Sequence, residues 1–406
     1  MTRCGVAINS CAMTVSVGIE AMGLAVPELY VDMAQLAEAR GVPVGKFVEG
    51  IGLKQMSVPA VDEDTVTLAV RAARMALAGV DLKDVGLCIV GTETAVDHSK
   101  PVTSFVQGLL GLPTHCRIYE TKHACYGGTA GLMTALDWIR SGSNRGRKAL
   151  IIASDIARYG LRSAGEPTQG AGAVAMLVSA TPSLVAFDQN VGTYANDVMD
   201  FWRPLYSKDA VVDGQYSVTC YLDALRGAYR AHQETGTGVT PSYSDRFAAI
   251  AYHVPYPKMA KKAHEALRLV DGDAAPAASF ERQVRTGLLL PERVGNIYTG
   301  SLYLSLLSVL NGDPRALDGQ ALGFFSYGSG SCAEFWSGTV TPGAQAKVKA
   351  LGLGALLEAR RQLTIAEYEQ IMTAREGLDT RVPGADPVPA FRFAGVENHR
   401  RLYTRA

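Results

Sequence analysis

The 406-residue sequence carries 39 basic and 39 acidic side chains and is 48% hydrophobic and 19% charged. Such a chain can bury a large core, and its zero formal charge, without an extended block of Lys and Arg, argues against a nucleic-acid partner. The longest apolar runs are only strand length, so we expect no membrane-spanning segment and no membrane partner.

The seven cysteines are odd in number, form no C-x-x-C pair and occur in a chain large enough to fold without disulfides. We therefore expect a reducing, cytoplasmic location. The weakly apolar N-terminal stretch is interrupted by Asn9 and Ser10, and we interpret residues 1–12 as an extension before a natural start near Met13 rather than a signal peptide.

Short apolar strands and helical patterns alternate in the first half. Residues 62–80 predict a helix that Asp64 caps and that ends near Gly79. Strand-like and helical runs then follow at 85–93, 102–111, 116–121, 123–140, 148–157 and 173–180. The fold class is therefore α/β, and the alternation predicts βαβ units around a mostly parallel, buried sheet.

A similar succession returns in the second half, with a strand at 246–255, helices at 258–270 and 296–312, and a strand at 322–330. This order suggests a duplicated unit, although the identity between the halves is too low to demonstrate one. Residues 196–232 read as a loop and a helix inserted beside a site. The tail predicts a helix at 364–378, a Pro-rich surface connection at 381–391 and a last strand.

Cys125 lies in the segment HACYGGTAGLMTALDWIR, residues 123–140. Gly127 and Gly128 permit close backbone approach, and the apolar run after them predicts a helix buried at the centre of the protein. A thiol at the N-terminus of that helix would be stabilised as a thiolate, which lowers its pKa and makes it a nucleophile. A small buried hydrophobic residue is the alternative, and this local pattern does not separate the two.

Two other side chains follow apolar strands, where α/β proteins bind their ligands. His253 lies at the end of the apolar strand in the run FAAIAYHVP, in which Pro255 stops the strand, and Glu93 comes shortly after CIVG. A satisfied core histidine and an exposed capping glutamate are the alternatives. The string QGAGAVA at 169–175 leads into a strand, and no zinc spacing or Walker loop occurs, so we expect no cofactor and no metal.

Taken in order, the motifs resemble one family: VGTETAVDHSKP, ACYGGTAGL, DIARYG with EPTQGAGAVAMLVS, DFWRP with VDGQYS, HVPYPKMAKKA, VGNIYTGSLYLSLLSVL and FSYGSGS. From about residue 16 to the end, the chain is similar to 3-hydroxy-3-methylglutaryl-CoA synthases of the bacterial mevalonate-pathway type, in the thiolase superfamily. The stretch before Met13 departs from the family pattern, and no long eukaryotic-type insertion is evident.

The resemblance implies a thiolase-like fold in which two similar α/β halves stack as five layers, αβαβα, within a homodimer. Residues 14–182 form the N-terminal half with Glu93 and Cys125. Residues 183–406 form the C-terminal half with His253, Asn296 and Ser329, and with an inserted segment near 190–240.

The resemblance also implies roles for individual residues. Cys125 matches the acylated cysteine, Glu93 the general acid/base and His253 the histidine of the acceptor site. Asn296 and Ser329 match polar groups that contact the thioester substrate. The remaining expected binding positions are Thr168, Ser217 and Lys262, with Tyr159 orienting the acetyl group.

The implied reaction condenses acetyl-CoA with acetoacetyl-CoA through an acetyl-Cys125 intermediate and then hydrolyses the enzyme thioester. A rival is the related enzyme of polyketide β-branching, which takes its acyl groups from an acyl carrier protein; EPTQGAGAVAMLVS and DFWRP look more like the mevalonate enzyme. A Cys/His hydrolase would not need Glu93 on a separate strand end, and a non-catalytic binding protein would not need all three residues.

Overall fold

The computed structural model describes residues 16–207, 209–235, 243–273, 276–374 and 391–404. The expected N-terminal extension and all but the last residue of the Pro-rich connection lie outside these ranges. Among the described helices, none is long and apolar enough to cross a membrane.

The main sheet is built from two sets of strands. The first set runs in the order β5 (Arg117–Thr121), β4 (Val85–Gly91), β6 (Lys148–Ala157), β7 (Gly170–Ser179) and β1 (Gly18–Ala25). The second continues with β8 (Val185–Ala195), β13 (Cys332–Val340), β12 (Ala321–Gly328) and β11 (Ala249–Tyr252). The sets meet where β1 pairs with β8 at only two positions, Gly18 with Ala186 and Ile19 with Val185.

The prediction of a mostly parallel sheet is wrong. Strand β4 runs parallel to β5 and β6, and β11 runs parallel to β12, but the strands between them pair antiparallel. Parallel neighbours require a crossover connection, which α4 (Val102–Leu110) and α5 (Gly127–Arg140) provide in the first half. No crossover helix links β6 to β7: residues 158–169 form a loop with a short 3₁₀ turn, so β7 returns antiparallel.

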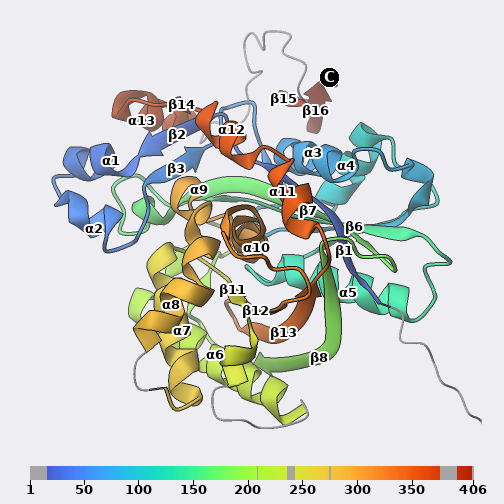
Figure 1. Cartoon of the computed structure of the whole chain (residues 1–406). Coiled ribbons are helices and arrows are strands. Elements are labelled where there is room, and N and C mark those ends of the chain that lie inside the picture. The colour runs from blue at the N-terminus through green and yellow to red at the C-terminus, as the bar shows by residue number, and fades with distance from the viewer. Residues whose placement is uncertain (1–15, 208, 236–242, 274–275, 375–390, 405–406) are drawn as a thin grey trace, which may run out of the picture.

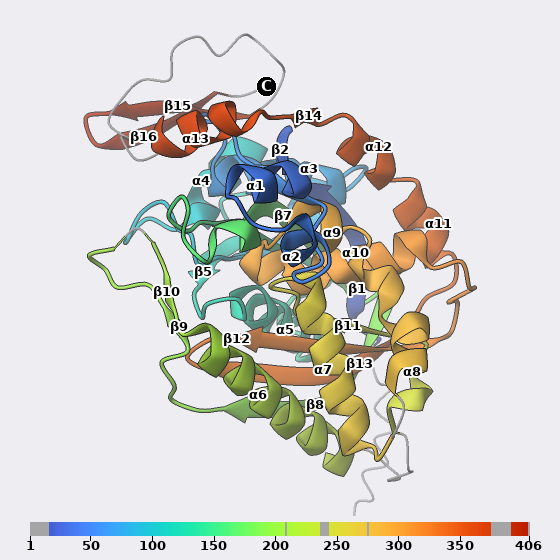
Figure 2. The same ribbon diagram turned by 90° about the vertical axis from the view of Figure 1, so that its left-hand side faces the viewer.

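The helices and the two strand sets form five layers, αβαβα, as expected (Figures 1 and 2). Helices α3 (Thr65–Ala76) and α4 (Val102–Leu110) cover the outer face of the first set. Helices α5 (Gly127–Arg140) and α10 (Ser301–Gly312) form the middle layer, in one apolar core with strands of both sets. Helices α6 (Gly214–Thr235) and α7 (Pro257–Val270) cover the second set.

Sequence signals explain where several elements begin and end. The Asp64 side chain accepts a hydrogen bond from the Thr67 N–H and Thr67 bonds back, a capping box that confirms the predicted start of α3. Gly79 lies beyond the end of that helix with φ of +77°, a conformation that glycine adopts without strain. Close backbone approach at α5 is also confirmed, because a Cβ on Gly128 would lie 2.9 Å from Ala153 Cβ.

Smaller elements surround the layers. Strands β2 (Leu29–Asp32), β3 (Gln55–Val58) and β14 (Arg361–Gln362) form a small sheet beside α1 (Met33–Ala39), α2 (Val44–Val48) and α13 (Ile365–Ala374), the predicted tail helix. Strands β9 (Phe201–Trp202) and β10 (Val211–Val212) precede α6. The remaining α-helices of the described ranges are α8 (Pro276–Gln283), α9 (Pro291–Val294), α11 (Ala344–Lys349) and α12 (Leu353–Glu358). The last described segment is a hairpin, β15 (Arg392–Glu397) and β16 (Arg400–Thr404), where one strand was predicted.

Candidate active site

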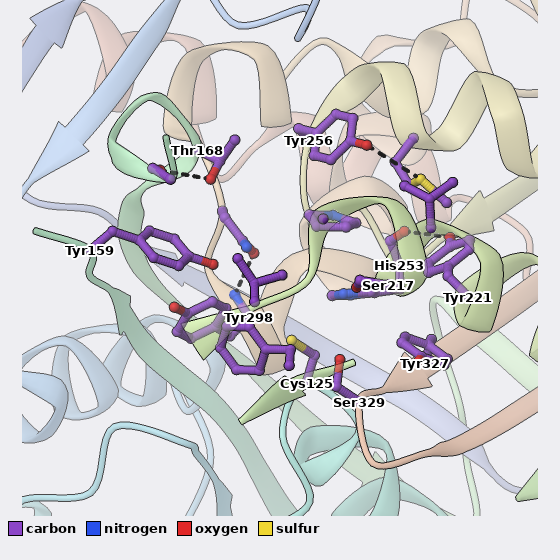
Figure 3. Close-up of a pocket in the computed structure, with 18 of the residues that line it drawn as sticks. Cys125, Tyr159, Thr168, Ser217, Tyr221, His253, Tyr256, Tyr298, Tyr327 and Ser329 are labelled. Atoms are coloured by element: carbon purple, nitrogen blue, oxygen red, sulfur yellow. Dashed lines mark hydrogen bonds between the residues drawn. The ribbon is translucent and has the colours of Figure 1, made fainter. Parts of the chain in front are cut away.

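A cavity of about 320 Å³ opens where the two halves meet, and both halves line it (Figure 3). Most of the predicted site residues lie in its wall: Cys125, Tyr159, Thr168, Ser217, His253, Asn296 and Ser329. Residues distant in sequence are therefore brought together as the resemblance implied. Glu93 and Lys262 are not among the lining residues.

Cys125 lies in the loop before α5, two residues ahead of the first helical residue, Gly127. Its Sγ donates a hydrogen bond to Glu93 Oε1 at 3.0 Å. Burial raises the pKa of the Cys125 thiol well above its ordinary value, and the negative charge of Glu93 raises it further. The prediction of a lowered pKa at a helix N-terminus is therefore wrong, because the side chain is buried against a carboxyl group.

Glu93 follows β4 by two residues, as its position in the sequence predicted; it contacts Cys125, which lines the cavity, without lining the cavity itself. Burial of the carboxyl group, together with the nearby negative charge of Asp155, raises the pKa of Glu93 to about 8. The hydrogen bond from Cys125 and the charge of Arg203 act in the opposite direction. A carboxyl group with this pKa can both accept and donate a proton near neutral pH.

Asp155 fixes the loop that carries Glu93. It is fully buried at the end of β6, and its Oδ1 accepts hydrogen bonds from the main-chain N–H of Glu93 at 2.9 Å and from the hydroxyl groups of Thr92 and Thr94. Its Oδ2 accepts from the N–H and hydroxyl of Thr299, which precedes α10. This carboxylate therefore links the loop that carries Glu93 to the segment before α10.

His253 follows β11 directly, so the strand predicted from FAAIAYHVP is confirmed. The main-chain N–H of His253 donates a hydrogen bond to the Phe325 carbonyl at 2.7 Å, and the main-chain carbonyl of His253 accepts one from the Tyr221 hydroxyl at 2.7 Å. These two bonds fix the main chain at this residue. Burial lowers the pKa of His253 to about 3. The imidazole is therefore neutral at physiological pH and presents a hydrogen-bond donor rather than an imidazolium.

Asn296 is 3% exposed, and its Oδ1 accepts hydrogen bonds from the Tyr298 N–H at 2.9 Å and the Ser301 hydroxyl at 3.0 Å. Its oxygen is thus occupied, and the amide N–H groups are the part of the side chain left for a ligand in the cavity it lines. Ser329 enters the wall directly after β12.

Of the remaining predicted binding residues, Thr168 and Ser217 line the cavity, whereas Lys262 does not. The Thr168 hydroxyl donates to the Gly165 carbonyl at 2.8 Å, and Ser217, in the first turn of α6, donates to Asp200 at 3.4 Å. Figure 3 shows Tyr159 and Thr168 on the side of the cavity opposite Ser217. Lys262 lies in the middle of α7, outside the described lining, and its binding role stays a prediction.

Sequence reasoning missed Asp155, Arg203 and Tyr298, although all three occur inside quoted motifs. Burial raises the pKa of the Tyr159 hydroxyl to about 12, and the Tyr298 side chain lies beside it. Tyr298 has φ of +42°, and Ala124, next to Cys125, has φ of +40°. Non-glycine residues in this conformation are uncommon and concentrate at functional sites.

Among the described residues, no cluster of three or more His, Cys, Asp or Glu could hold a metal ion.

Comparison with known proteins identifies the family to which the chain belongs. Two family models match, "Hydroxymethylglutaryl-coenzyme A synthase N terminal" over residues 13–182 and "Hydroxymethylglutaryl-coenzyme A synthase C terminal" over residues 185–278 and 274–382. Hydroxymethylglutaryl-CoA synthase of Enterococcus faecalis is 40% identical over 90% of this chain and 94% of its own. The polyketide biosynthesis 3-hydroxy-3-methylglutaryl-ACP synthase PksG of Bacillus subtilis (strain 168) is 36% identical over 87% of each.

Among solved structures, "MvaS in complex with 3-hydroxy-3-methylglutaryl coenzyme A" is 48% identical and superposes with a TM-score of 0.90 over 96% of this chain and 99% of that one. This agreement extends over both halves and establishes the thiolase-like fold that the resemblance implied. The chain belongs to the hydroxymethylglutaryl-CoA synthase family of acyl-transferring condensing enzymes.

Proposed function

We propose that this chain condenses acetyl-CoA with acetoacetyl-CoA to give 3-hydroxy-3-methylglutaryl-CoA and free CoA, with Cys125 as nucleophile and Glu93 as base. The observation that carries the assignment of roles is the 3.0 Å hydrogen bond from Cys125 Sγ to Glu93 Oε1, beside a cavity that His253 lines from the other half. A nucleophile, a proton acceptor and a polarising group meet at one point.

In the first step the Glu93 carboxylate accepts the thiol proton while Cys125 Sγ attacks the carbonyl carbon of acetyl-CoA. Collapse of the tetrahedral intermediate breaks the carbon–sulfur bond to CoA, and the proton passes from Glu93 to the CoA sulfur. Because one thioester replaces another, the exchange is nearly isoenergetic, and the acetyl methyl hydrogens stay acidic enough to be removed. The raised thiol pKa explains why the proton needs a direct acceptor.

In the second step Glu93 removes a methyl proton, and the enolate carbon attacks the ketone carbon of acetoacetyl-CoA. The neutral His253 imidazole and the Asn296 amide donate hydrogen bonds to the ketone oxygen as negative charge develops there. The proton that reaches this oxygen comes from the Glu93 acid just formed. Water then attacks the thioester, the carbon–sulfur bond to Cys125 breaks, and the released product leaves a protonated thiol.

The acyl donor separates this function from the carrier-protein alternative. The relative named for carrier-protein substrates is 36% identical, below the 40% of the Enterococcus faecalis hydroxymethylglutaryl-CoA synthase. Among the solved structures, MvaS in complex with 3-hydroxy-3-methylglutaryl coenzyme A is 48% identical and an HMG synthase in complex with a holo donor-ACP is 33% identical. Both differences support CoA thioesters as substrates. The edge strand β5, which has β4 as its only neighbour in the sheet of the described chain, supports the homodimer. A cytoplasmic location rests on the unpaired cysteines, as all five in the described ranges are free.

The test supplies the purified protein with acetyl-CoA and acetoacetyl-CoA, and in parallel with the same acyl groups on carrier proteins. We expect 3-hydroxy-3-methylglutaryl-CoA by mass spectrometry and one CoA thiol released per turnover in the first reaction. Turnover confined to the carrier-protein substrates would contradict the CoA assignment and support the alternative. The mass of the native assembly, measured by light scattering, tests the homodimer.

A further inference from the structure

Arg203 follows β9 and reaches the loop that carries the base. Its Nη1 donates a hydrogen bond of 2.8 Å to the main-chain carbonyl of Glu93. Its Nε is buried, with no hydrogen-bond partner in the described chain, and its guanidinium forms no salt bridge with a described residue. Because a guanidinium stays protonated in proteins, a positive charge without a paired carboxylate lies beside Glu93.

Several ionisable groups besides Arg203 surround Glu93. Asp155 faces the base from β6 and Cys125 from the loop before α5. The charge of Glu93 raises the pKa of the Tyr159 and Tyr298 hydroxyl groups, and the charge of Arg203 acts in the opposite direction. Asp155 is held by hydrogen bonds from both halves, so its negative charge is fixed in place. The positive charge of Arg203 is opposed to that of Asp155 and offsets part of its effect on the base.

The segment that carries Arg203 is also anchored to the site. The ring of Phe201 packs edge-on against Tyr298 with 5.9 Å between centroids, and both residues line the cavity. Arg203 itself does not line the cavity, so it acts through Glu93 rather than on the substrate. A planar guanidinium directs several N–H donors in fixed directions, whereas lysine offers one flexible ammonium group.

We propose that Arg203 is a positioning residue of the condensation, fixing the Glu93 main chain through Nη1 and placing beside Glu93 a permanent positive charge that counteracts the charge of Asp155. The inference rests on the function proposed above, in which Glu93 alternates between carboxylate and acid. In the carboxylate form the guanidinium offsets repulsion from Asp155. In the acid form, after proton removal from the acetyl methyl group, the hydrogen bond from Nη1 still holds the main chain of Glu93.

The test uses Arg203→Gln, which keeps an N–H donor and removes the charge, and Arg203→Lys, which keeps the charge. For each we measure the pH profile of kcat/KM and the exchange of acetyl methyl hydrogens with D₂O. In Arg203→Gln the acid limb of the profile moves to higher pH, and exchange falls about tenfold at neutral pH for each unit of displacement. High pH restores much of the rate. Arg203→Lys keeps the limb near its wild-type position.

Arg226, on the outward side of α6 and paired with Asp223, provides the matched control: Arg226→Gln leaves the profile unchanged. A limb that stays at its wild-type pH in Arg203→Gln overturns the proposal, whether the rate is unchanged or lower at every pH. If Arg203→Gln folds poorly, a displaced limb in Arg203→Lys overturns it instead. Acetylation and turnover by the wild-type protein test the proposed function separately, so the two failures are distinguishable.

Discussion

Replacing Glu93 with Gln removes the proposed base while keeping its shape. We expect condensation to fall by about 10²–10⁴-fold, or roughly 3–5 kcal/mol in the barrier. Nearby groups are poor substitutes for the base. The Asp155 carboxylate is occupied by hydrogen bonds from Thr92, Thr94 and Thr299. The pKa of His253 lies at about 3, which makes its imidazole a weak base.

Three measurements on Glu93→Gln separate the steps: acetylation of Cys125 by intact mass, exchange of the acetyl methyl hydrogens with D₂O, and product formation. Acetylation is slower but still reaches completion, because a thiol can also lose its proton to solvent. Exchange and condensation fall by the larger factor, because a methyl C–H bond needs a positioned base. The exposed Glu358, on α12, provides the control Glu358→Gln. Condensation at the wild-type rate would refute the reasoning and leave Glu93 as a structural cap.

Further predictions concern pH, substrate binding and stability. The Glu93 carboxyl group must be ionised to accept the thiol proton, and its pKa is about 8. We therefore expect kcat/KM for acetyl transfer to rise with pH and to level off above pH 8. A profile that is flat from pH 6 to 9 would contradict this. Lys262→Ala raises KM with little change in kcat, whereas Lys261→Ala, its exposed neighbour on α7, changes neither; a large loss of kcat at constant KM would exclude the binding role. Asp64→Ala removes the cap of α3 and the partner of Arg401. We expect urea denaturation to show a free energy of unfolding lower by about 1–3 kcal/mol. An unchanged denaturation midpoint would show that neither contact stabilises the fold.

Much of the framework could be predicted from local pattern. The capping residue and apolar stripe of α3 set its position, and the apolar strands before Glu93 and His253 placed both side chains at strand ends. The roles predicted for these residues came from the order of several motifs rather than from any one of them. Local pattern around Cys125 alone did not distinguish a nucleophile from a small buried residue.

The remaining features depend on contacts between segments distant in sequence. The antiparallel return of β7 follows from a loop between β6 and β7, which strand-length apolar runs do not reveal. Asp155 and Arg203 act on Glu93 from separate elements, so no spacing rule identifies them. The direction of the Cys125 pKa shift also needed the fold, because burial beside Glu93 outweighs any stabilisation from the helix end.

The most direct test of the central claim is to follow acetyl label through Cys125. The protein is incubated with labelled acetyl-CoA, digested and mapped by mass spectrometry, and a second sample is chased with acetoacetyl-CoA. We predict one acetyl group per chain on the peptide that contains Cys125, its loss during the chase with matching formation of labelled 3-hydroxy-3-methylglutaryl-CoA, and no label in Cys125→Ala. Stoichiometric labelling of Cys125→Ala, or product formed without an acetylated enzyme, would contradict the account.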